Sequence, residues 1–411
     1  MVELKLEGEL SDVGFDPGRI ARIPTYFDDL VAAGHLSGWL TTINRDGKLV
    51  WVGRGGHRDR ERSLEVTDDT IWRLFSMTKP ITAVAALMLY EEGKFDLNDE
   101  VSRWISEFKE PRVYVEGPAI AMTTRPASEP VRVHHLFTHM AGLTYGFQSV
   151  SPVDACYRAM GYDELSWKFP EGADLASAVR DWSTAPLLFD PGSAWNYSIG
   201  LEVLGRLIEI WSGQRLDHFI AEHILDPLGM TDTEWYCPPE KKERLAMLYL
   251  NYNGAALAIE EIGSAFLKEP TLFLGGGGLV STAGDFQSFM SMLLNHGTWN
   301  GTTFLAPRTV EMMTRNHLPD NATIGDLGRG VFSNDGQVGN GYGLGVAVTV
   351  DQIRNKSLMT EGSYFWGGAA STSFWIDPEE DLSVAFYAQL LPSTSHTWRR
   401  TLHQLVYSSL R

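Results

Sequence analysis

Residues 71–93 read IWRLFSMTKPITAVAALMLYEEG, a short β-like run followed by a serine–lysine pair and an apolar helix. Ser76-Met77-Thr78-Lys79 is an S-x-x-K motif. Residues three apart in a helix share one face, so the lysine amine can reach the serine hydroxyl and accept its proton. Pro80 suits the first turn of a helix, where backbone amides have no partner. The stretch therefore predicts a nucleophilic Ser76 at or just before the start of a helix that is apolar all round and lies in the core.

A second S-x-x-K match shows how weak the pattern is alone. Ser106-Glu107-Phe108-Lys109 lies in a charged stretch that runs into Pro111, which is typical of a solvated surface turn. Ser76 instead stands between two apolar segments, where a lysine is costly unless it has a purpose. We therefore predict that Ser76 and Lys79 are catalytic and that Ser106 is not.

The composition limits the class of protein. The chain has 411 residues, 44% hydrophobic and 21% charged, and its formal net charge is -18. An acidic surface repels phosphate groups, which argues against nucleic acid and against anionic membranes as partners. Cys156 and Cys237 are too few and too far apart for a disulfide framework. The first residues lack an apolar segment of signal-peptide length, and the longest apolar run is too short to span a bilayer, so we expect a cytoplasmic protein.

Strand-like segments occur at both ends of the chain and helical ones between them. Asp46-Gly47 separates two apolar runs, 38–45 and 48–56, and predicts a hairpin. Further strands are expected at 341–351, 369–377 and 381–390, and helices at 199–212, 282–297 and 395–409. The pattern predicts an α/β sheet domain built from residues 1–75 and 335–411. A mainly helical domain, residues 76–334, is then inserted, with the active site at the junction.

Several blocks in the right order resemble the penicillin-recognising serine hydrolases, and within them the class C β-lactamases and especially the family VIII carboxylesterases. They are FSMTKPITAVAALMLYEEGKFDLNDEV (75–101), VHHLFTHMAGLTY (133–145), PGSAWNYSIGLEVLGRLIEIWSG (191–213) and GGGGLVSTAGDFQSFMSMLLNHG (275–297). The resemblance implies a β-lactamase-like fold, an antiparallel sheet flanked by helices, and an acyl-enzyme mechanism.

By this resemblance Tyr197 is the third catalytic residue. The family motif has Asn two residues after the tyrosine, and here Ile199 takes that place. Esterases of the family often lack this Asn, whereas β-lactamases generally use it near the amide side chain of their substrates. Tyr249-Leu250-Asn251 fits the strict pattern but lacks the surrounding block, so we favour Tyr197.

The resemblance also places a third motif at Trp366-Gly367-Gly368, where β-lactamases carry Lys-Thr-Gly. These residues would contact substrate, and the amides of Ser76 and Ala369 would form the oxyanion hole. A tryptophan in place of the cation that grips the carboxylate of penicillins lowers the expectation of lactam turnover.

No cofactor is expected. His135 and His139 are four apart, but no adjacent glutamate completes a zinc motif, and no metal site is predicted. The glycines at 275–278 lack the Lys-Ser or Lys-Thr of a phosphate loop and indicate a turn or close packing. We therefore predict a carboxylesterase for short-chain acyl or aryl esters. A β-lactamase, a D-amino-acid peptidase, an acyltransferase and a non-catalytic binding protein remain alternatives, and the oligomeric state stays open.

Overall fold

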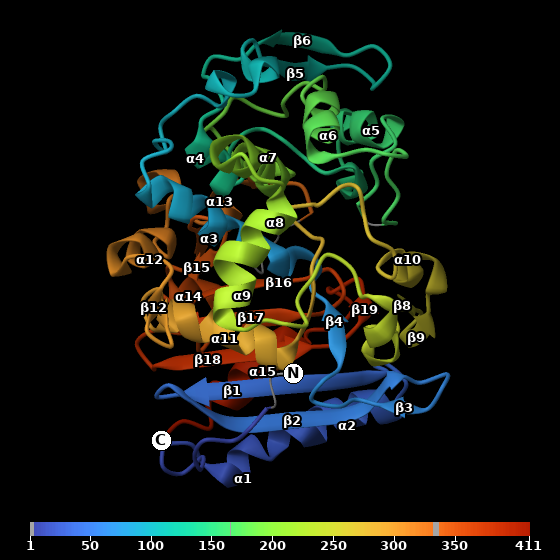
Figure 1. The fold of residues 1–411 in the computed structure, drawn as a ribbon, viewed down its shortest axis with the longest axis vertical. Coiled ribbons are helices and arrows are strands. Elements are labelled where there is room, and N and C mark those ends of the chain that lie inside the picture. The colour runs from blue at the N-terminus through green and yellow to red at the C-terminus, as the bar shows by residue number, and fades with distance from the viewer. Residues whose placement is uncertain (1–3, 165, 332–336) are drawn as a thin grey trace.

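The two ends of the chain form one sheet (Figure 1). The computed structural model describes residues 4–164, 166–331 and 337–411. All neighbouring strands of this sheet are antiparallel. Their order is β14 (Asn340–Tyr342), β15 (Ala347–Thr349), β16 (Tyr364–Gly367), β17 (Ser373–Asp377), β18 (Leu382–Tyr387), β1 (Gly38–Arg45), β2 (Lys48–Asp59) and β3 (Leu64–Glu65). The predicted antiparallel sheet flanked by helices is confirmed.

The hairpin between β1 and β2 forms where it was predicted. Asp46 has φ 52° and Gly47 φ 70°, the left-handed conformations that a two-residue turn of this kind requires. The other edge of β1 pairs with β18, with Leu40 opposite Tyr387. This pairing joins residues that are more than 300 positions apart in the chain.

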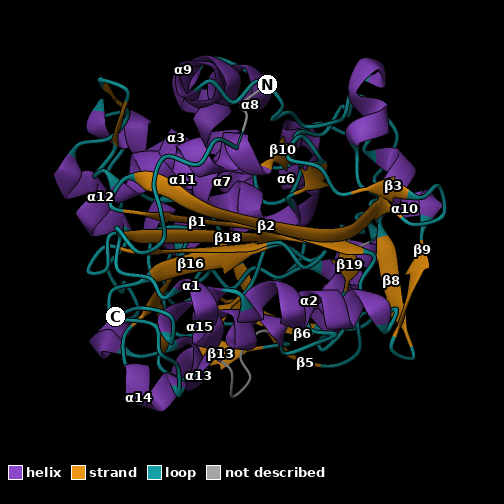
Figure 2. Ribbon diagram, turned by 90° about the horizontal axis from the view of Figure 1, so that it is seen from below, coloured by secondary structure: helices purple, strands orange, loops and turns teal. Residues whose placement is uncertain are grey.

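Helices cover both faces of the sheet (Figure 2). On one side lie α1 (Pro17–Ile20), α2 (Arg22–Ala32) and α15 (Trp398–Tyr407), and on the other α11 (Ala283–Leu294). Successive strand residues point to opposite faces, so Trp39 packs with the α2–α15 cluster and Leu40 with the larger core. Both clusters are apolar because the sheet is buried on both sides.

The rest of the chain is mainly helical and lies next to the β15–β16 side of the sheet (Figure 1). Its helices are α3 (Thr78–Glu91), α4 (Val133–Phe137), α5 (Pro152–Ala159), α6 (Leu175–Trp182), α7 (Gly200–Ser212), α8 (Leu216–Ile220), α9 (Asp226–Leu228), α10 (Glu260–Ala265), α12 (Pro307–Met313) and α13 (Ile324–Leu327), and α14 (Gln352–Asn355) joins β15 to β16. Short strand pairs link it, among them β4 (Ile71–Arg73) with β10 (Val280–Thr282) and β7 (Trp195–Asn196) with β13 (Gly328–Arg329). None of the described helices is long and apolar enough to cross a bilayer. The predicted domain boundary at 334/335 lies outside the described residues.

Several element boundaries differ from the sequence prediction, among them those of the last helix, which spans Trp398–Tyr407 and not 395–409. The run 341–351 is two strands, because Gly345 takes φ 88° and the chain turns between β14 and β15. The strand expected from Ala369 begins at Ser373, because residues 368–372 form a hydrogen-bonded turn. The helix expected to reach Gly297 ends at Leu294. In contrast, α7 ends as predicted: its last residue is Ser212, and Gly213 caps it with φ 73°, as a helix-closing glycine should.

Candidate active site

Ser76 lies in a tight turn between β4 and α3. The single-turn 3-10 helix η1 (Phe75–Met77) connects the two, and α3 begins at Thr78, so the predicted placement of Ser76 just before the helix is confirmed. Phe75 has φ 46°, a left-handed conformation that is costly for a bulky residue. Its buried ring meets Trp167 and Phe266 edge-on. This packing holds the strained turn and leaves Ser76 only partly buried at its apex.

Lys79 points back at the serine from the first turn of α3. Its Nζ lies 3.5 Å from Ser76 Oγ and donates to the carbonyl of Gly276 at 2.6 Å. The side chain is 1% exposed. Two aromatic rings face the amine, Tyr197 at 4.6 Å and Tyr145 at 5.2 Å from ring centre to Nζ. The carbonyl and the ring faces partly replace the water that a buried cation loses.

Tyr197 completes the arrangement from the opposite side. Its hydroxyl donates to Ser76 Oγ at 2.7 Å. The residue lies between β7 and α7, and its backbone carbonyl accepts hydrogen bonds from Gln148 Nε2 and Asn196 Nδ2. The ring of His139 packs 4.8 Å from the tyrosine ring. The three residues that sequence reasoning proposed as catalytic therefore meet at one point.

The third motif lies on β16, beside the nucleophile turn. The Trp366 ring is 5.5 Å from that of Tyr197. Gly368 packs so closely that a Cβ there would lie 2.2 Å from the carbonyl oxygen of Leu74, and Thr372 Oγ1 donates to the same oxygen at 3.2 Å. These two contacts hold the turn that carries Ala369 against Leu74, which lies two residues before Ser76 in the chain. The sequence had placed this motif before a strand, whereas Trp366 and Gly367 are themselves strand residues.

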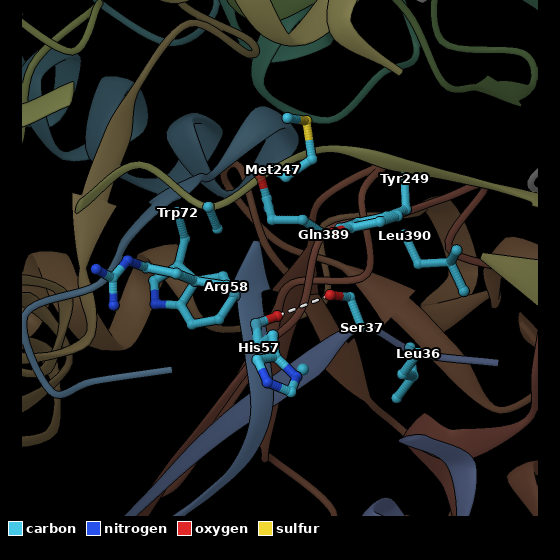
Figure 3. Close-up of a pocket in the computed structure, with 11 residues that line it drawn as sticks. Leu36, Ser37, His57, Arg58, Trp72, Met247, Tyr249, Gln389 and Leu390 are labelled. Atoms are coloured by element: carbon cyan, nitrogen blue, oxygen red, sulfur yellow. Dashed lines mark hydrogen bonds between the residues drawn. The ribbon is translucent and has the colours of Figure 1, made fainter. Parts of the chain in front are cut away.

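The competing motif matches lie elsewhere. Ser106 is exposed in a 3-10 turn and its hydroxyl contacts Glu107. Tyr249 is on β8 (Tyr249–Tyr252), donates its hydroxyl to Glu61 at 2.6 Å, and lines a separate small pocket (Figure 3). In that pocket the Ser37 hydroxyl points at the backbone carbonyl of His57, at 2.8 Å, and not at its ring. No nucleophile–base pair is formed there.

His135 and His139 do not share a helix face. Helix α4 ends at Phe137, and His139 has φ 57°. Burial and the Lys79 charge hold the pKa of His139 well below its usual value, and its Nδ1 lies 3.0 Å from Ser198 Oγ. Neutral His139 therefore positions the segment that carries Tyr197. Within the described ranges, no group of three or more histidine, cysteine or acidic residues is arranged to hold a metal ion.

The glycine run 275–278 is a site of close packing, as one of the two predicted alternatives had it. A Cβ on Gly275 would lie 2.5 Å from the carbonyl oxygen of Leu201. Sequence reasoning missed that Gly276 supplies the acceptor for Lys79, and it missed two buried side chains behind it, Tyr145 and Glu202. The Tyr145 hydroxyl donates to Glu202 Oε1 at 2.8 Å. A signal for Glu202 was present: a lone acidic residue early in the apolar face of a predicted helix.

Comparison with known proteins identifies the family. The Beta-lactamase family model matches residues 23–407. The chain belongs to the beta-lactamase family. Esterase EstB of Burkholderia gladioli is 30% identical over 382 residues, 89% of this chain and 88% of EstB. Protein Rv1367c of Mycobacterium tuberculosis is 32% identical over 366 residues, 88% of each. EstCE1, a hydrolase with promiscuous acyltransferase activity, has the same fold, with TM-score 0.78, 24% identity and coverage of 95% of this chain and 98% of its own.

This beta-lactamase family member is a serine hydrolase by fold and by relationship. Its family includes both esterases and acyltransferases. The predicted superfamily and fold are thereby confirmed.

Proposed function

We propose that the protein is a carboxylesterase for short-chain acyl or aryl esters, with Ser76 as nucleophile and Lys79 and Tyr197 as proton-transfer residues. The observation that carries the proposal is the geometry around Ser76 Oγ, with Tyr197 OH at 2.7 Å and Lys79 Nζ at 3.5 Å. A nucleophile within hydrogen-bond reach of its bases is the arrangement that acyl transfer requires.

In the first half-reaction Ser76 Oγ attacks the ester carbonyl. Its proton passes to the Lys79–Tyr197 pair, and the pair returns a proton to the alkoxide as it leaves. The acyl group is then bound to Ser76 as an ester. In the second half-reaction the same pair takes a proton from water, the hydroxide attacks the acyl carbonyl, and Ser76 recovers its proton as the acid departs.

The oxyanion formed in each half-reaction needs donors. We assign this role to the backbone amides of Ser76 and Ala369, because the turn after β16 is pinned against Leu74. One such donor is worth about 3 kcal/mol in an unrelated serine hydrolase with a comparable oxyanion hole. Gly367 and Gly368 leave room beside the acyl group, and Trp366 offers an apolar surface to it.

Esters fit this site better than lactams. By the family resemblance, Ile199 takes the place of an amide side chain of the β-lactamases, and Trp366 takes the place of their cation. The EstB relative is named an esterase. An acyltransferase, in which an alcohol replaces water in the second half-reaction, is the second candidate, supported by the likeness to EstCE1, a hydrolase with promiscuous acyltransferase activity.

The test is turnover of p-nitrophenyl butyrate beside a chromogenic cephalosporin, with Ser76→Ala as the variant and Ser106→Ala as the matched control. We expect ester turnover that Ser76→Ala abolishes, that Ser106→Ala leaves unchanged, and that exceeds lactam turnover by at least about 100-fold. Equal turnover of the two substrates would contradict the assignment of Ile199 and Trp366. Ester turnover that survives in Ser76→Ala would show that Ser76 is not the nucleophile. Added alcohol that diverts the acyl group from water would favour the acyltransferase.

A further inference from the structure

A buried carboxyl group lies behind the Lys79 amine. Glu202, in the first turn of α7, is 1% exposed. Its Oε1 accepts the Tyr145 hydroxyl, while its Oε2 is buried and has no hydrogen-bond partner among the described residues. Leaving a buried carboxyl half paired costs free energy. Packing alone does not explain a glutamate here, since an apolar side chain would fill the space without that cost.

Two residues connect Glu202 to Lys79. A Cβ on Gly276 would lie 2.1 Å from Glu202 Oε1, so the carboxyl group packs directly on the residue whose carbonyl accepts from Lys79 Nζ. Tyr145 makes the second connection, because its ring faces Nζ at 5.2 Å while its hydroxyl bonds Glu202. Substitutions at Glu202 therefore act on the amine without touching the acyl group.

We infer that Glu202 is a positioning residue, which supplies the buried negative charge that stabilises the Lys79 ammonium and, with Tyr145 and Gly276, holds that amine at Ser76. This inference rests on the proposed function. No carboxylate of the described residues forms a salt bridge with Lys79, so Glu202 compensates its charge through space. At short range in a poorly solvated site such a charge acts strongly.

A second buried carboxyl group, Glu164, provides a contrast. Burial, and then the charge of Glu202, raise the pKa of Glu164 to about 8, so it is neutral at pH 7. Burial also raises the pKa of Glu202, but Lys79 and the Tyr145 hydroxyl oppose that rise. Two neighbouring carboxyl groups do not both ionise easily. Of the two carboxyl groups, Glu202 therefore carries the negative charge, because it accepts a hydrogen bond from the Tyr145 hydroxyl.

Other titratable groups also face this centre. Burial keeps Tyr145 a neutral phenol by raising its pKa well above the usual value, and His139 is neutral for the reason given above. Asp163 adds a negative charge felt by Glu164. Among the described residues, the titratable groups around Lys79 thus include Tyr145, Tyr197, His139, Glu164 and Glu202, with Asp163 beside Glu164 and Tyr342 beside Tyr197 and His139.

The experiment compares Glu202→Gln with Glu164→Gln, two amide substitutions of buried carboxyl groups, in the full chain. The pH dependence of kcat/KM is measured with p-nitrophenyl butyrate from pH 5 to 9. Glu202→Gln removes a negative charge, so we expect the ascending limb, which reports deprotonation of the base, to move about one unit toward lower pH. We expect kcat at the optimum to fall about tenfold and KM to stay within about twofold. Glu164→Gln removes no charge below pH 7 and should leave the limb in place.

A second readout separates this inference from the proposed function. The rate at which a fluorophosphonate labels Ser76 is followed by intact mass over the same pH range. Ser76 Oγ bonds to phosphorus, fluoride leaves and the serine proton passes to the base. If the wild type labels but cleaves no ester, the esterase proposal fails and the labelling profile still tests Glu202.

The inference is overturned if Glu202→Gln keeps the wild-type limb, or if Glu164→Gln moves the limb equally far. Should Glu202→Gln not fold, Tyr145→Phe takes its place. Loss of the hydroxyl donor makes Glu202 harder to ionise, so a smaller shift in the same direction is expected. An unmoved limb in Tyr145→Phe, with unchanged kcat, would reject the inference.

Discussion

Lys79 is the residue at which burial and chemistry are most closely linked. A lysine that is 1% exposed loses hydration worth several kcal/mol. The Gly276 carbonyl and the two tyrosine rings recover part of that energy. The same contacts leave Nζ 3.5 Å from the serine hydroxyl, a separation that a small movement on substrate binding would close.

Substitution of Lys79 and Tyr197 tests their part in proton transfer. Lys79→Ala and Tyr197→Phe should each lower kcat by about 10²–10⁴-fold, because each removes one member of the pair that moves the serine proton. Lys109→Ala, in the exposed second S-x-x-K match, is the control and should be silent. Steady-state kinetics and circular dichroism on all three variants check the prediction. Near wild-type turnover in either active-site variant would show that its side chain is not needed to move the proton.

Sequence reasoning succeeds at this scale where the chemistry is local. Ser76 and Lys79 are three residues apart, so helix geometry alone brings them together. Glu202 meets Tyr145 across 57 positions and Gly276 across 74, and no periodicity relates such residues. In addition, Gly276 binds Lys79 through its backbone carbonyl, a contact that a sequence does not reveal.

At the scale of elements, the last helix braces the turn beside the nucleophile. Arg399 on α15 donates from Nη2 to the carbonyls of Gly368, at 3.2 Å, and Thr372, at 3.0 Å. Burial lowers the pKa of Arg399 to about 10, so it stays charged at neutral pH. The two carbonyls belong to the ends of the turn that carries Ala369. Helix α15 therefore takes part in shaping the proposed oxyanion hole from the far side of β16.

Arg399→Met should weaken that turn. The variant keeps side-chain length but removes the Arg399 donor from two carbonyls, which are left with their backbone donors alone. We therefore expect a loss of about 1–3 kcal/mol in unfolding free energy and roughly a tenfold lower kcat. Arg400→Met is a matched control, because Nη2 of Arg400 also donates to two carbonyls, of Asn355 and Lys356, away from the turn. Urea unfolding and ester kinetics separate the two effects. Equal losses of kcat in both variants would contradict a special role for Arg399.

The elements that the sequence predicted well carry their own end signals. Asp46-Gly47 closes a hairpin and Gly213 ends α7, because each turn needs a left-handed residue at that point. Strand β16 was not predicted. It is four residues long, ends in glycine and draws its register from β17, so tertiary pairing rather than local propensity defines it.

At the scale of the whole molecule, the site depends on segments from distant parts of the chain. Ser76 and Lys79 follow β4, and Tyr197 precedes α7. The Trp366 motif belongs to the main sheet, in which β1 from one end of the chain pairs with β18 from the other. The sequence predicted this joining of the chain ends because strand-like patterns occur only near them. How the two parts are oriented depends on side-chain packing over hundreds of residues, which no sequence pattern encodes.

Buried titratable groups should give the whole protein a stability maximum near neutral pH. Burial lowers the pKa of His134 and His135 to about 4 and of His403 to about 3. The unfolded chain, with histidines near 6.5, then binds more protons between about pH 4 and 6.5, so stability rises with pH across that window.

Above pH 6.5 the balance reverses. The histidines are neutral in both states, while Glu164, with a pKa of about 8 in the fold, binds a proton that the unfolded chain has already released. Stability then falls by up to about 1.4 kcal/mol per pH unit toward pH 8. Thermal unfolding from pH 5 to 9 in 0.2 M salt should show a maximum near pH 6.5. Glu164 opposes the rise below that pH as well, so Glu164→Gln should steepen the rising limb and flatten the fall. An equally steep fall in the variant would mean that other groups, or repulsion within a chain of net charge -18, set the alkaline limit of stability.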